Sequence, residues 1–398
     1  MKKVIILIVT IVLIIVSINL YNNYKISHAK KIVELTTTEV ETFSSVKLKD
    51  LISTINGKIV DNKKIDTTKI GKQEITFHYI TDKNIKVPYT IEINIVDKTP
   101  PLIYQSSKYS VTVNTTKKEL EESLFCGDNY DPNPKCTIEG DYDLNTTGEY
   151  NVTFKGVDSS NNISAHSFIL KVKEKSNNKN TSSNSSYTEY TSFNDIVKEY
   201  KNNNTKIGID ISHWQGKIDY KKVKASGVEF VYIRVGRGNG IGEDYVLDDK
   251  FEEYIKGFNK VKIPVGVYFY SNANSKEDAI KEAKWVLSKI KKYQVDLEIV
   301  FDWENWDYFQ EYDLSFFSLT EMAKAFINTV EKAGYKGMLY SSKYYLENIW
   351  FPLKSNIWLA HYINQTNYEG QYQVWQICDD GKVDGIADNQ VDINIMYK

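Results

Sequence analysis

The feature that most constrains the fold is a series of apolar segments in the C-terminal half of the chain, from Lys206 onward. Amphipathic helical segments separate several of them, most clearly at 248–260, 275–292 and 318–333. Near-continuous apolar strands that alternate with helices predict a parallel, buried sheet closed into a (β/α)8-type, TIM-like barrel. Little chain separates the last three strands, so we expect an irregular barrel there. The eight predicted strands are 206–211, 228–235, 264–270, 297–303, 336–341, 356–361, 373–377 and 391–395.

Two carboxylates stand at the end of one predicted strand, in "VFDWE". Asp302 and Glu304 are two residues apart, so they project to the same side of a strand, about 6 to 7 Å from each other. At the end of an arbitrary strand such acids more often simply reach water. Burying unpaired charge beside large rings such as Trp303 and Trp306 is costly, however, and usually marks a site.

Other polar and aromatic residues also fall at predicted strand ends. In a barrel of this type the carboxyl ends of the strands meet at one face, where chemistry collects. An acid-rich, ring-lined pocket suits glycoside cleavage, because one carboxyl protonates the leaving oxygen while another stabilises the oxocarbenium charge. Besides Asp302 and Glu304, the candidates are Asp210, Arg234, Tyr268, Tyr270, Tyr340, Tyr362, Trp375 and Asp392.

Several of these candidates have a structural alternative. Asp210 and Asp392 are acids that can pin strands together through backbone hydrogen bonds, and Arg234 is a cation that can neutralise the acids and thereby tune their pKa values. His213 and His361 are as readily structural as functional. For Glu304 we expect a pKa raised by its acidic neighbours and by Trp303 or Trp306.

The region from Lys206 to Tyr397 resembles the glycoside hydrolase family 25 lysozymes, which are N-acetylmuramidases. The resemblance rests on segments that occur in order, including "GIDISHWQG", "VGVYFYS", "VFDWE", "IWLAHY" and "VDIN". It implies cleavage, with retention, of the β-1,4 bond between N-acetylmuramic acid and N-acetylglucosamine. The alternatives are a non-catalytic glycan-binding or adhesive surface protein, a glycosidase of chitin-like polymers, and an enzyme ancillary to the N-terminal modules.

The same resemblance implies roles for individual residues. Glu304 matches the general acid/base, and Asp302 matches the acid that steers the substrate's N-acetyl group or stabilises the intermediate. Asp210 and Asp392 match the remaining pocket acids, and Arg234 stands where the family usually has Lys or a similar cation. Sugar contacts are implied for Tyr340, Tyr362 and Trp375. The sequence departs from the family at Tyr268, Phe269 and Tyr270, where Tyr-His-Phe is common, so no histidine acts there.

The N-terminal half contains a repeated β pattern. Ile70–Lys98 aligns with Thr147–Lys175 at a constant offset, and both show period-two alternation broken by turn residues, which predicts antiparallel strands in small sandwiches. The "DKTPP" between them places modules at 38–98 and 99–175, and both resemble bacterial immunoglobulin-like modules, which more often act as spacers than bind ligands. Solvated loop acids are commoner than calcium ligands, so no metal or cofactor is predicted. These loop acids are Asp128, Asp131 and Asp158.

The N-terminus predicts export. Lys2 and Lys3 precede an apolar run, Val4–Leu20, which as a helix spans roughly 25 Å and is not directly followed by a small-x-small cleavage site. This favours an uncleaved anchor over residues 1–25 rather than a removed signal peptide. The remainder would then lie outside the cell membrane, or in the cell wall if secreted. We expect peptidoglycan glycan strands and the membrane as partners.

Composition and cysteine usage agree with this assignment. The net charge of -2 gives no reason to expect a nucleic-acid partner, and we expect a monomer. Cys126 and Cys136 are close enough to close a small loop, worth roughly 2 to 3 kcal/mol, which would leave Cys378 over. The polar stretch from 176 predicts a flexible linker over 176–204, before a catalytic domain over 205–398.

Overall fold

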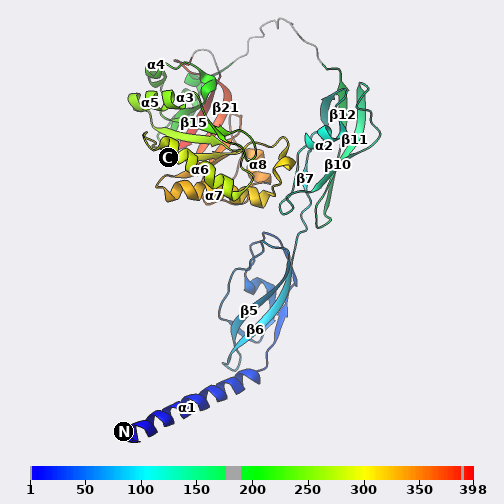
Figure 1. Ribbon diagram of the computed structural model, residues 1–398, viewed down its shortest axis with the longest axis vertical. Helices are drawn as coiled ribbons and strands as arrows, with labels where there is room; N and C mark the ends of the chain where they lie inside the picture. Colours follow the sequence, from blue (N-terminus) through cyan, green and yellow to red (C-terminus); the bar gives the residue numbers. More distant parts are fainter. Residues whose placement is uncertain (1, 176–189, 387–389) are drawn as a thin grey trace. The chain divides into compact units, whose positions relative to one another are not determined.

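The computed structural model describes residues 2–175, 190–386 and 390–398. The chain divides into two compact units, residues 1–99 and 100–398. The first contains helix α1 (Lys2–Ser27) and a small β module, and the second contains another β module and a large barrel-like sheet (Figure 1).

Helix α1 is the one helix, among the described residues, that is long and apolar enough to cross a membrane, over Ile5–Ser27. None of the residues in its most apolar stretch is buried by other parts of the protein. Such a surface is stable only when apolar surroundings cover it. Its length and composition are those of a membrane anchor or of a signal sequence.

The sequence repeat is also a repeat of structure. Strands β5 (Gly71–Thr81) and β6 (Lys86–Val96) form an antiparallel hairpin, and β11 (Gly148–Val157) and β12 (Ile163–Lys173) form another. The aligned Phe77 and Phe154 are both buried. Both turns contain an asparagine with positive φ, Asn84 (58°) and Asn161 (68°), a conformation that asparagine tolerates better than most residues.

Each hairpin belongs to a four-stranded sheet, and each module adds a two-stranded sheet. The first module has the order β2-β6-β5-β4 and the pair β1-β3; the second has β10-β11-β12-β8 and β7-β9. The remaining bounds are β1 (Val33–Leu35), β2 (Glu39–Glu41), β3 (Ile52–Ile55), β4 (Gly57–Ile59), β7 (Leu102–Ile103), β8 (Lys108–Thr112), β9 (Cys126–Gly127) and β10 (Lys135–Glu139), with α2 (Lys117–Glu122) and the 3-10 turn η1 (Leu48–Leu51).

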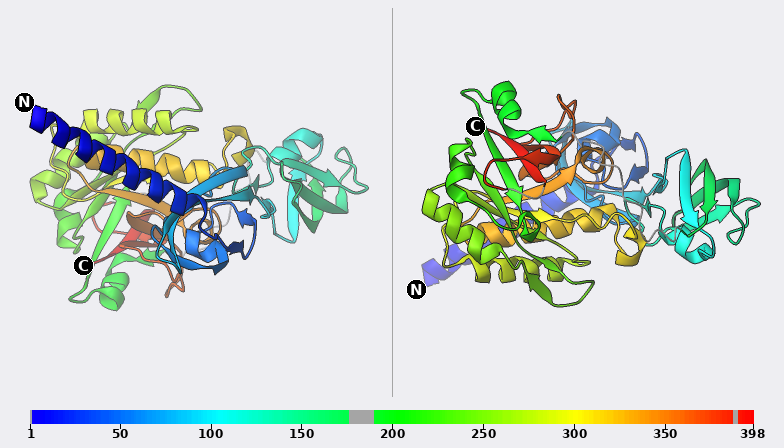
Figure 2. Two further views of the ribbon diagram at one scale, coloured as in Figure 1. Left: turned by 90° about the horizontal axis from the view of Figure 1, so that it is seen from below. Right: turned by 90° about the horizontal axis from the view of Figure 1, so that it is seen from above.

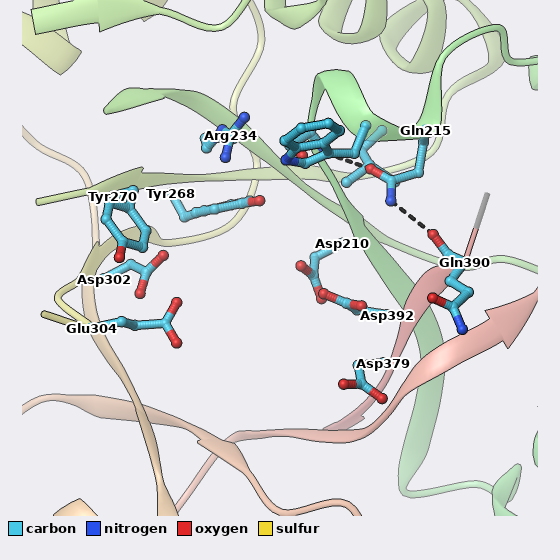
Figure 3. A pocket seen from close by; sticks show the side chains of 13 residues that line it. Asp210, Gln215, Arg234, Tyr268, Tyr270, Asp302, Glu304, Asp379, Gln390 and Asp392 are labelled. Carbon is cyan, nitrogen blue, oxygen red and sulfur yellow. Dashed lines mark hydrogen bonds between the residues drawn. The ribbon is translucent and has the colours of Figure 1, made fainter. Parts of the chain in front are cut away.

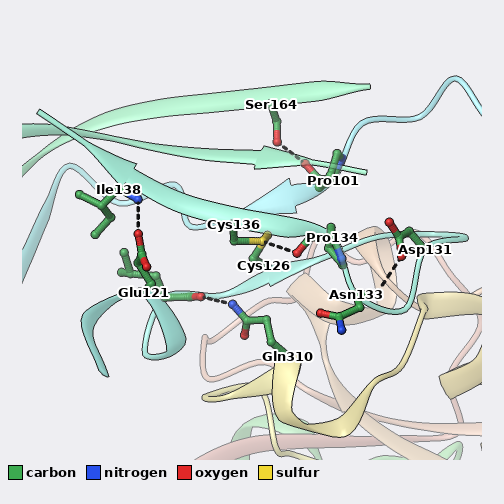
Figure 4. The surroundings of a disulfide bond; sticks show 11 residues. Pro101, Glu121, Cys126, Asp131, Asn133, Pro134, Cys136, Ile138, Ser164 and Gln310 are labelled. Atoms are coloured by element: carbon green, nitrogen blue, oxygen red, sulfur yellow. Dashed lines mark hydrogen bonds between the residues drawn. A yellow bond between two sulfur atoms is a disulfide. The ribbon is translucent and has the colours of Figure 1, made fainter. Parts of the chain in front are cut away.

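A disulfide joins Cys126 of β9 to Cys136 of β10 and so ties the two sheets of the second module together (Figure 4). Cys126 is fully buried in the core of this module. Cys378 of the barrel is a free, buried thiol, so the third cysteine is left over as expected.

All eight predicted barrel strands are present and close into a ring. The first seven pair in parallel, whereas β22 pairs antiparallel with both β21 and β14. The prediction of an entirely parallel sheet was therefore wrong for the last strand. Residues 383–390 are too few for the crossover of a dozen or more residues that a parallel strand needs. The strands are β14 (Thr205–Ile211), β15 (Val231–Gly238), β17 (Val265–Tyr270), β18 (Ile299–Asp302), β19 (Gly337–Ser342), β20 (Asn356–Ala360), β21 (Val374–Lys382) and β22 (Val391–Tyr397).

The core has an inner and an outer layer. Large side chains including Tyr232, Met338 and Trp358 fill the inside of the barrel. Alternate residues of the same strands face the helices α5 (Phe251–Val261), α6 (Lys276–Ile290) and α7 (Phe316–Lys332), which pack outside β15 to β19 (Figure 2). The remaining elements are α4 (Tyr220–Ala225), α8 (Lys343–Asn348), β16 (Tyr245–Leu247), η2 (His213–Gln215) and η3 (Phe309–Tyr312).

Most of the predicted linker, 176–189, lies outside the described residues. Its last part is not a linker. Strand β13 (Thr191–Ser192) pairs with β21, and α3 (Phe193–Tyr200) follows it. Phe193 and Ile196 form an apolar face of α3 and are buried in the barrel's outer core. The linker prediction extended too far because it was based on the polar composition of the residues before this helix.

Within the second unit, the loop around β9 touches the start of α7. The Phe125 ring lies 5.4 Å from that of Phe309 and is stacked 6.3 Å from that of Phe316. Gln310 Nε2 donates to Leu124 O at 2.9 Å (Figure 4), and the Phe316 amide donates to Asp128 O at 2.8 Å. The second module therefore contacts the segment that follows β18.

Candidate active site

A pocket of about 420 Å³ lies at the carboxyl ends of the barrel strands (Figure 3). All four predicted acids line it, so groups separated by up to 182 positions in the chain, from 210 to 392, meet at one place. Its lining is Asp210, Ile211, Ser212, Trp214, Gln215, Arg234, Tyr268, Tyr270, Asp302, Glu304, Asp379, Gln390 and Asp392.

Asp302 and Glu304 stand on one wall of this pocket (Figure 3). Strand β18 ends at Asp302, so Glu304 belongs to the segment after the strand rather than to the strand itself. The side-chain alternation nevertheless continues. Trp303 is fully buried in the outer core and donates its indole N–H to Ala273 O at 3.2 Å, while Glu304 remains exposed to the pocket.

Both carboxyl groups hold their protons more strongly than ordinary acids do. Burial raises the pKa of Asp302 well above its usual value, and the adjacent Glu304 carboxylate raises it further. Burial also raises the pKa of Glu304, but of the predicted causes the acidic neighbour Asp302 acts in the opposite direction. The hydrogen bond from Asp302 lowers the pKa of Glu304 rather than raising it.

Asp210 and Asp392 form a second pair on neighbouring strands. They are directly opposite each other in the antiparallel register of β14 and β22. Gln376 Nε2 donates to Asp210 Oδ2 at 2.9 Å and to Asp392 Oδ2 at 3.2 Å, and Asn394 Nδ2 donates to Asp210 at 2.8 Å. Burial raises the pKa of both acids, and proximity to Asp210 raises that of Asp392 further. Two such carboxyls are most stable when they hold a proton between them.

Gln376 connects this acid pair to the predicted tyrosines. Its Oε1 atom accepts hydrogen bonds from Tyr340 Oη at 2.8 Å and from Tyr362 Oη at 2.9 Å. Its Nε2 atom donates to Asp210 and Asp392. Tyr340 and Tyr362 thus lie beside the pocket, and Tyr268 and Tyr270 line it directly. All four predicted tyrosines are brought together.

Trp375 is the predicted substrate-binding residue that the structure places elsewhere. It precedes Gln376 on β21, so its side chain points to the opposite face of the strand. It is 3% exposed, donates its indole N–H to His361 O and packs edge-on against Tyr200 of α3. Trp375 is therefore part of the outer core rather than a sugar-binding surface.

Arg234 lines the pocket but is engaged by an acid that sequence reasoning missed. Its Nε and Nη2 atoms both lie 2.9 Å from Asp248 Oδ2, and Nη2 also contacts His213 Nδ1. Burial alone would raise the pKa of Asp248, but amide hydrogen bonds from His213 and Lys250, with the Arg234 charge, outweigh it and leave the pKa lowered. Arg234 therefore forms a fixed ion pair at the edge of the pocket.

Other lining residues come from η2, from the loop before β22 and from the later part of β21, and the predicted strand ends do not reveal them. Trp214 follows β14 in the "GIDISHWQG" segment and is 67% exposed, with its ring against that of His213. Gln215 Nε2 donates to Gln390 O at 2.8 Å and so joins the first and last strands' loops (Figure 3). Asp379 adds a fifth acid from β21.

Among the described residues, the pocket acids do not form a set of three ligand atoms close enough to hold a metal ion. In the second β module, carboxylate oxygens of Asp128 and Asp158 lie within 4.8 Å of each other. Asp128, Asp131 and Asp158 each accept amide hydrogen bonds within their loops. We assign no metal site.

Paired carboxyl groups in a pocket at the carboxyl ends of barrel strands are the arrangement that glycoside hydrolases use. Residues 209–386 match the family model described as Glycosyl hydrolases family 25. The barrel is therefore similar to the glycoside hydrolases of family 25.

Two relatives and one solved structure illustrate the similarity. The autolytic lysozyme of Clostridium acetobutylicum is 27% identical over 183 residues, which are 45% of this chain and 52% of that protein. Lysozyme M1 of Streptomyces globisporus is 36% identical over 69 residues, 17% of this chain and 21% of that protein. A family 25 glycosyl hydrolase from Bacillus anthracis has a TM-score of 0.43 and 21% identity, covering 50% of this chain and 92% of that one. The chain thus spans about half the length (52%) of the Clostridium relative.

Proposed function

We propose that this protein hydrolyses peptidoglycan at the β-1,4 bond between N-acetylmuramic acid and N-acetylglucosamine, with retention of configuration. The observation that carries the proposal is the meeting of Asp302, Glu304, Asp210 and Asp392 in one pocket of about 420 Å³ in a domain that matches the family 25 model. Tyr268 and Tyr270 in the same wall supply flat surfaces on which sugar rings can lie.

Glu304 is the proposed general acid and base. Its side chain is open to the pocket, and its raised pKa favours the protonated form, which can deliver a proton to the glycosidic oxygen. After the bond breaks, the resulting carboxylate takes a proton from the incoming water. A group that alternates between these roles needs access to both the leaving oxygen and water, which a fully buried acid lacks.

Asp302 is the proposed partner on the substrate side. It is 4% exposed and fixed beside Glu304, so its carboxyl group can hold the acetamido group of the substrate against the anomeric carbon by hydrogen bonding. Attack by the acetamido oxygen followed by water gives two inversions and hence net retention. Asp210 and Asp392, with Gln376, shape the opposite side of the pocket.

The other parts of the chain place this activity. We propose that α1 holds the protein at the outer face of the cell membrane, and that the β modules, which we regard as immunoglobulin-like, set the distance between membrane and barrel. Peptidoglycan glycan strands are the expected partner.

The decisive test compares wild type and Glu304→Gln in digestion of purified cell walls, with products identified by mass spectrometry. Wild type should release fragments that carry muramic acid at the reducing end, and nascent products should show the retained anomer by NMR. Loss of the proton donor should lower turnover by at least about 10² to 10⁴-fold, the range for general acid catalysis.

The matched control is Glu311→Gln, which makes the same change at an exposed acid in the same segment and should leave turnover unchanged. Near-wild-type activity of Glu304→Gln would refute the assignment of the acid. Products with N-acetylglucosamine at the reducing end would instead refute the proposed bond.

A further inference from the structure

Glu282 of α6 is a buried acid that the proposed mechanism does not use. Its side chain is 2% exposed and lies outside the pocket that contains Glu304. A buried carboxyl group is costly unless its hydrogen bonds are satisfied, so its partners indicate what it does.

Those partners are three consecutive residues after β17. Ser271 Oγ bonds Glu282 Oε2 at 2.6 Å, and the Asn272 amide donates to Glu282 Oε1 at 3.2 Å. The Ala273 amide donates to the same Ser271 hydroxyl oxygen at 3.1 Å. One carboxyl group therefore holds the whole 271–273 turn.

Residues 271–273 also form hydrogen bonds with the residues on both sides of Glu304. The Ser271 amide donates to Asp302 O at 2.7 Å, and Asn305 Nδ2 donates to Ser271 O at 2.8 Å. The Trp303 indole donates to Ala273 O at 3.2 Å, and Asn272 Nδ2 donates to Asn305 Oδ1 at 3.0 Å. The turn thus contacts Asp302, Trp303 and Asn305, which lie on both sides of Glu304 in the chain.

We infer that Glu282 is a positioning residue, which fixes the 271–273 turn and through it the segment 302–305 that aims Glu304 into the pocket. The inference rests on the proposed function for its effect on turnover, but not for its effect on structure. A displacement of about 1 Å in a catalytic group can cost roughly 10²-fold in rate, so a rigid support of this kind has a kinetic consequence.

The protonation state of Glu282 suggests a conservative replacement. Burial raises the pKa of Glu282 to about 8, although hydrogen bonds from Ser271 and Asn272 act in the opposite direction. The group is therefore neutral near pH 7. Glutamine presents the same pair of atoms, with its amide donating to Ser271 Oγ and its oxygen accepting from the Asn272 amide.

The test measures cell-wall digestion by the full chain for Glu282→Ala and Glu282→Gln at pH 7. Glu282→Ala should lower kcat by about 10 to 100-fold, because the Glu304 carboxyl group is displaced from its catalytic position. KM should change less than twofold, because the substrate-binding surfaces stay in place. Glu282→Gln should recover kcat to within about threefold of wild type.

The matched control is Glu298→Ala. Glu298 is also 2% exposed and bonds Tyr232 Oη and Asn356 Nδ2, but it is not among the residues that line the pocket. Both alanine variants should lose thermal stability, whereas only Glu282→Ala should lose kcat. Equal kcat in the two variants would overturn the inference.

A readout without substrate separates this inference from the proposed function. The Trp306 amide donates to Glu304 O at 2.8 Å, and its hydrogen exchange reports the order of the catalytic segment. Exchange should be faster in Glu282→Ala than in Glu298→Ala, even if wild type cleaves no cell wall, and equal exchange would overturn the inference. If Glu282→Ala does not fold, Ser271→Ala removes the hydroxyl link instead and should show the same two effects.

Discussion

At the scale of single residues, the pocket gathers four carboxyl groups that are harder to ionise than ordinary ones. Burial raises the pKa of Asp210, Asp302, Glu304 and Asp392 alike. At a pH between the pKa of such a group in the unfolded chain and its pKa in the folded chain, the folded chain binds more protons than the unfolded chain. The contribution of these groups to stability is largest below an ordinary aspartate pKa of 3.8 and declines as the pH rises.

A substitution at Asp392 tests this dependence of stability on pH. Asp392→Asn keeps an oxygen that accepts from Gln376 but cannot ionise, so the variant should melt at a higher temperature than wild type at pH 7 and show no gain at pH 4. The expected rise is about 2 to 4 °C, the effect of roughly 1 kcal/mol in a domain of this size. Thermal unfolding of the full chain in detergent, at both pH values, measures it.

The comparison variant is Asp384→Asn, an exposed acid in the loop after β21, whose melting temperature should follow wild type at both pH values. Cell-wall digestion by Asp392→Asn should fall in parallel with the gain in stability. A lower melting temperature at pH 7 would show instead that the ionised Asp392 stabilises the barrel.

At the scale of elements, strands could be predicted because a buried strand needs an uninterrupted apolar run, and the eight runs are plain in the sequence. The acids at their ends could be found for the same reason. The alternation of side chains does not tell which of two neighbouring residues at a strand end faces the pocket. Trp375 and Gln376 are both plausible at the end of β21, and only the pairing with β22 decides that Gln376 faces the acids.

Loop contributions could not be predicted for a different physical reason. Asp248 reaches Arg234 because the chain returns to β15 through the short strand β16, a pairing that depends on tertiary contacts rather than on local pattern. Trp214 enters the pocket from the short 3-10 turn η2 and Gln390 from a loop, and neither period two nor period 3.6 applies to such segments. The antiparallel direction of β22, in contrast, could have been predicted, because residues 383–390 are too few for a parallel crossover.

The contact between the second β module and the barrel is an element-scale feature with a measurable consequence. Phe125→Ala removes the ring that packs on Phe309 and Phe316, so the amides of Phe316 and Phe317, which donate to Asp128 O and Asn129 O, should exchange hydrogen at least about tenfold faster, an effect of about 1.4 kcal/mol. Hydrogen exchange with peptide-level mass spectrometry on the full chain measures this.

The internal reference is the amide of Thr320 onward in α7, whose hydrogen bonds lie within the helix and should be unaffected. A second check is Gly127→Ala, because a Cβ at this position would lie 2.6 Å from Phe316 Cε1 and 2.8 Å from Phe309 Cε1. Unchanged exchange at Phe316 in both variants would mean that the module does not restrain the barrel.

At the scale of the whole molecule, one apolar helix precedes two β modules and an enzyme domain. Under the proposed function, attachment through α1 would keep the barrel near an insoluble polymer close to the membrane. Helix α1 has 23 residues, Ile5–Ser27, in its apolar span, enough to cross a bilayer core of about 30 Å. Lys2 and Lys3, which precede the apolar span, favour an orientation with the N-terminus inside.

The anchor leads to the last prediction. The full chain produced in a bacterial host should sediment with membranes, resist extraction by high salt and be released by detergent, because burial of an apolar helix is insensitive to salt. A variant lacking residues 2–27, with a cleavable signal peptide in their place, should be soluble and should digest purified cell walls at the same rate per molecule. The N-terminal sequence of the wild-type protein distinguishes the two outcomes: an intact start at residue 1 or 2 supports the anchor, and a mature start beyond residue 20 would show that α1 is a removed signal sequence.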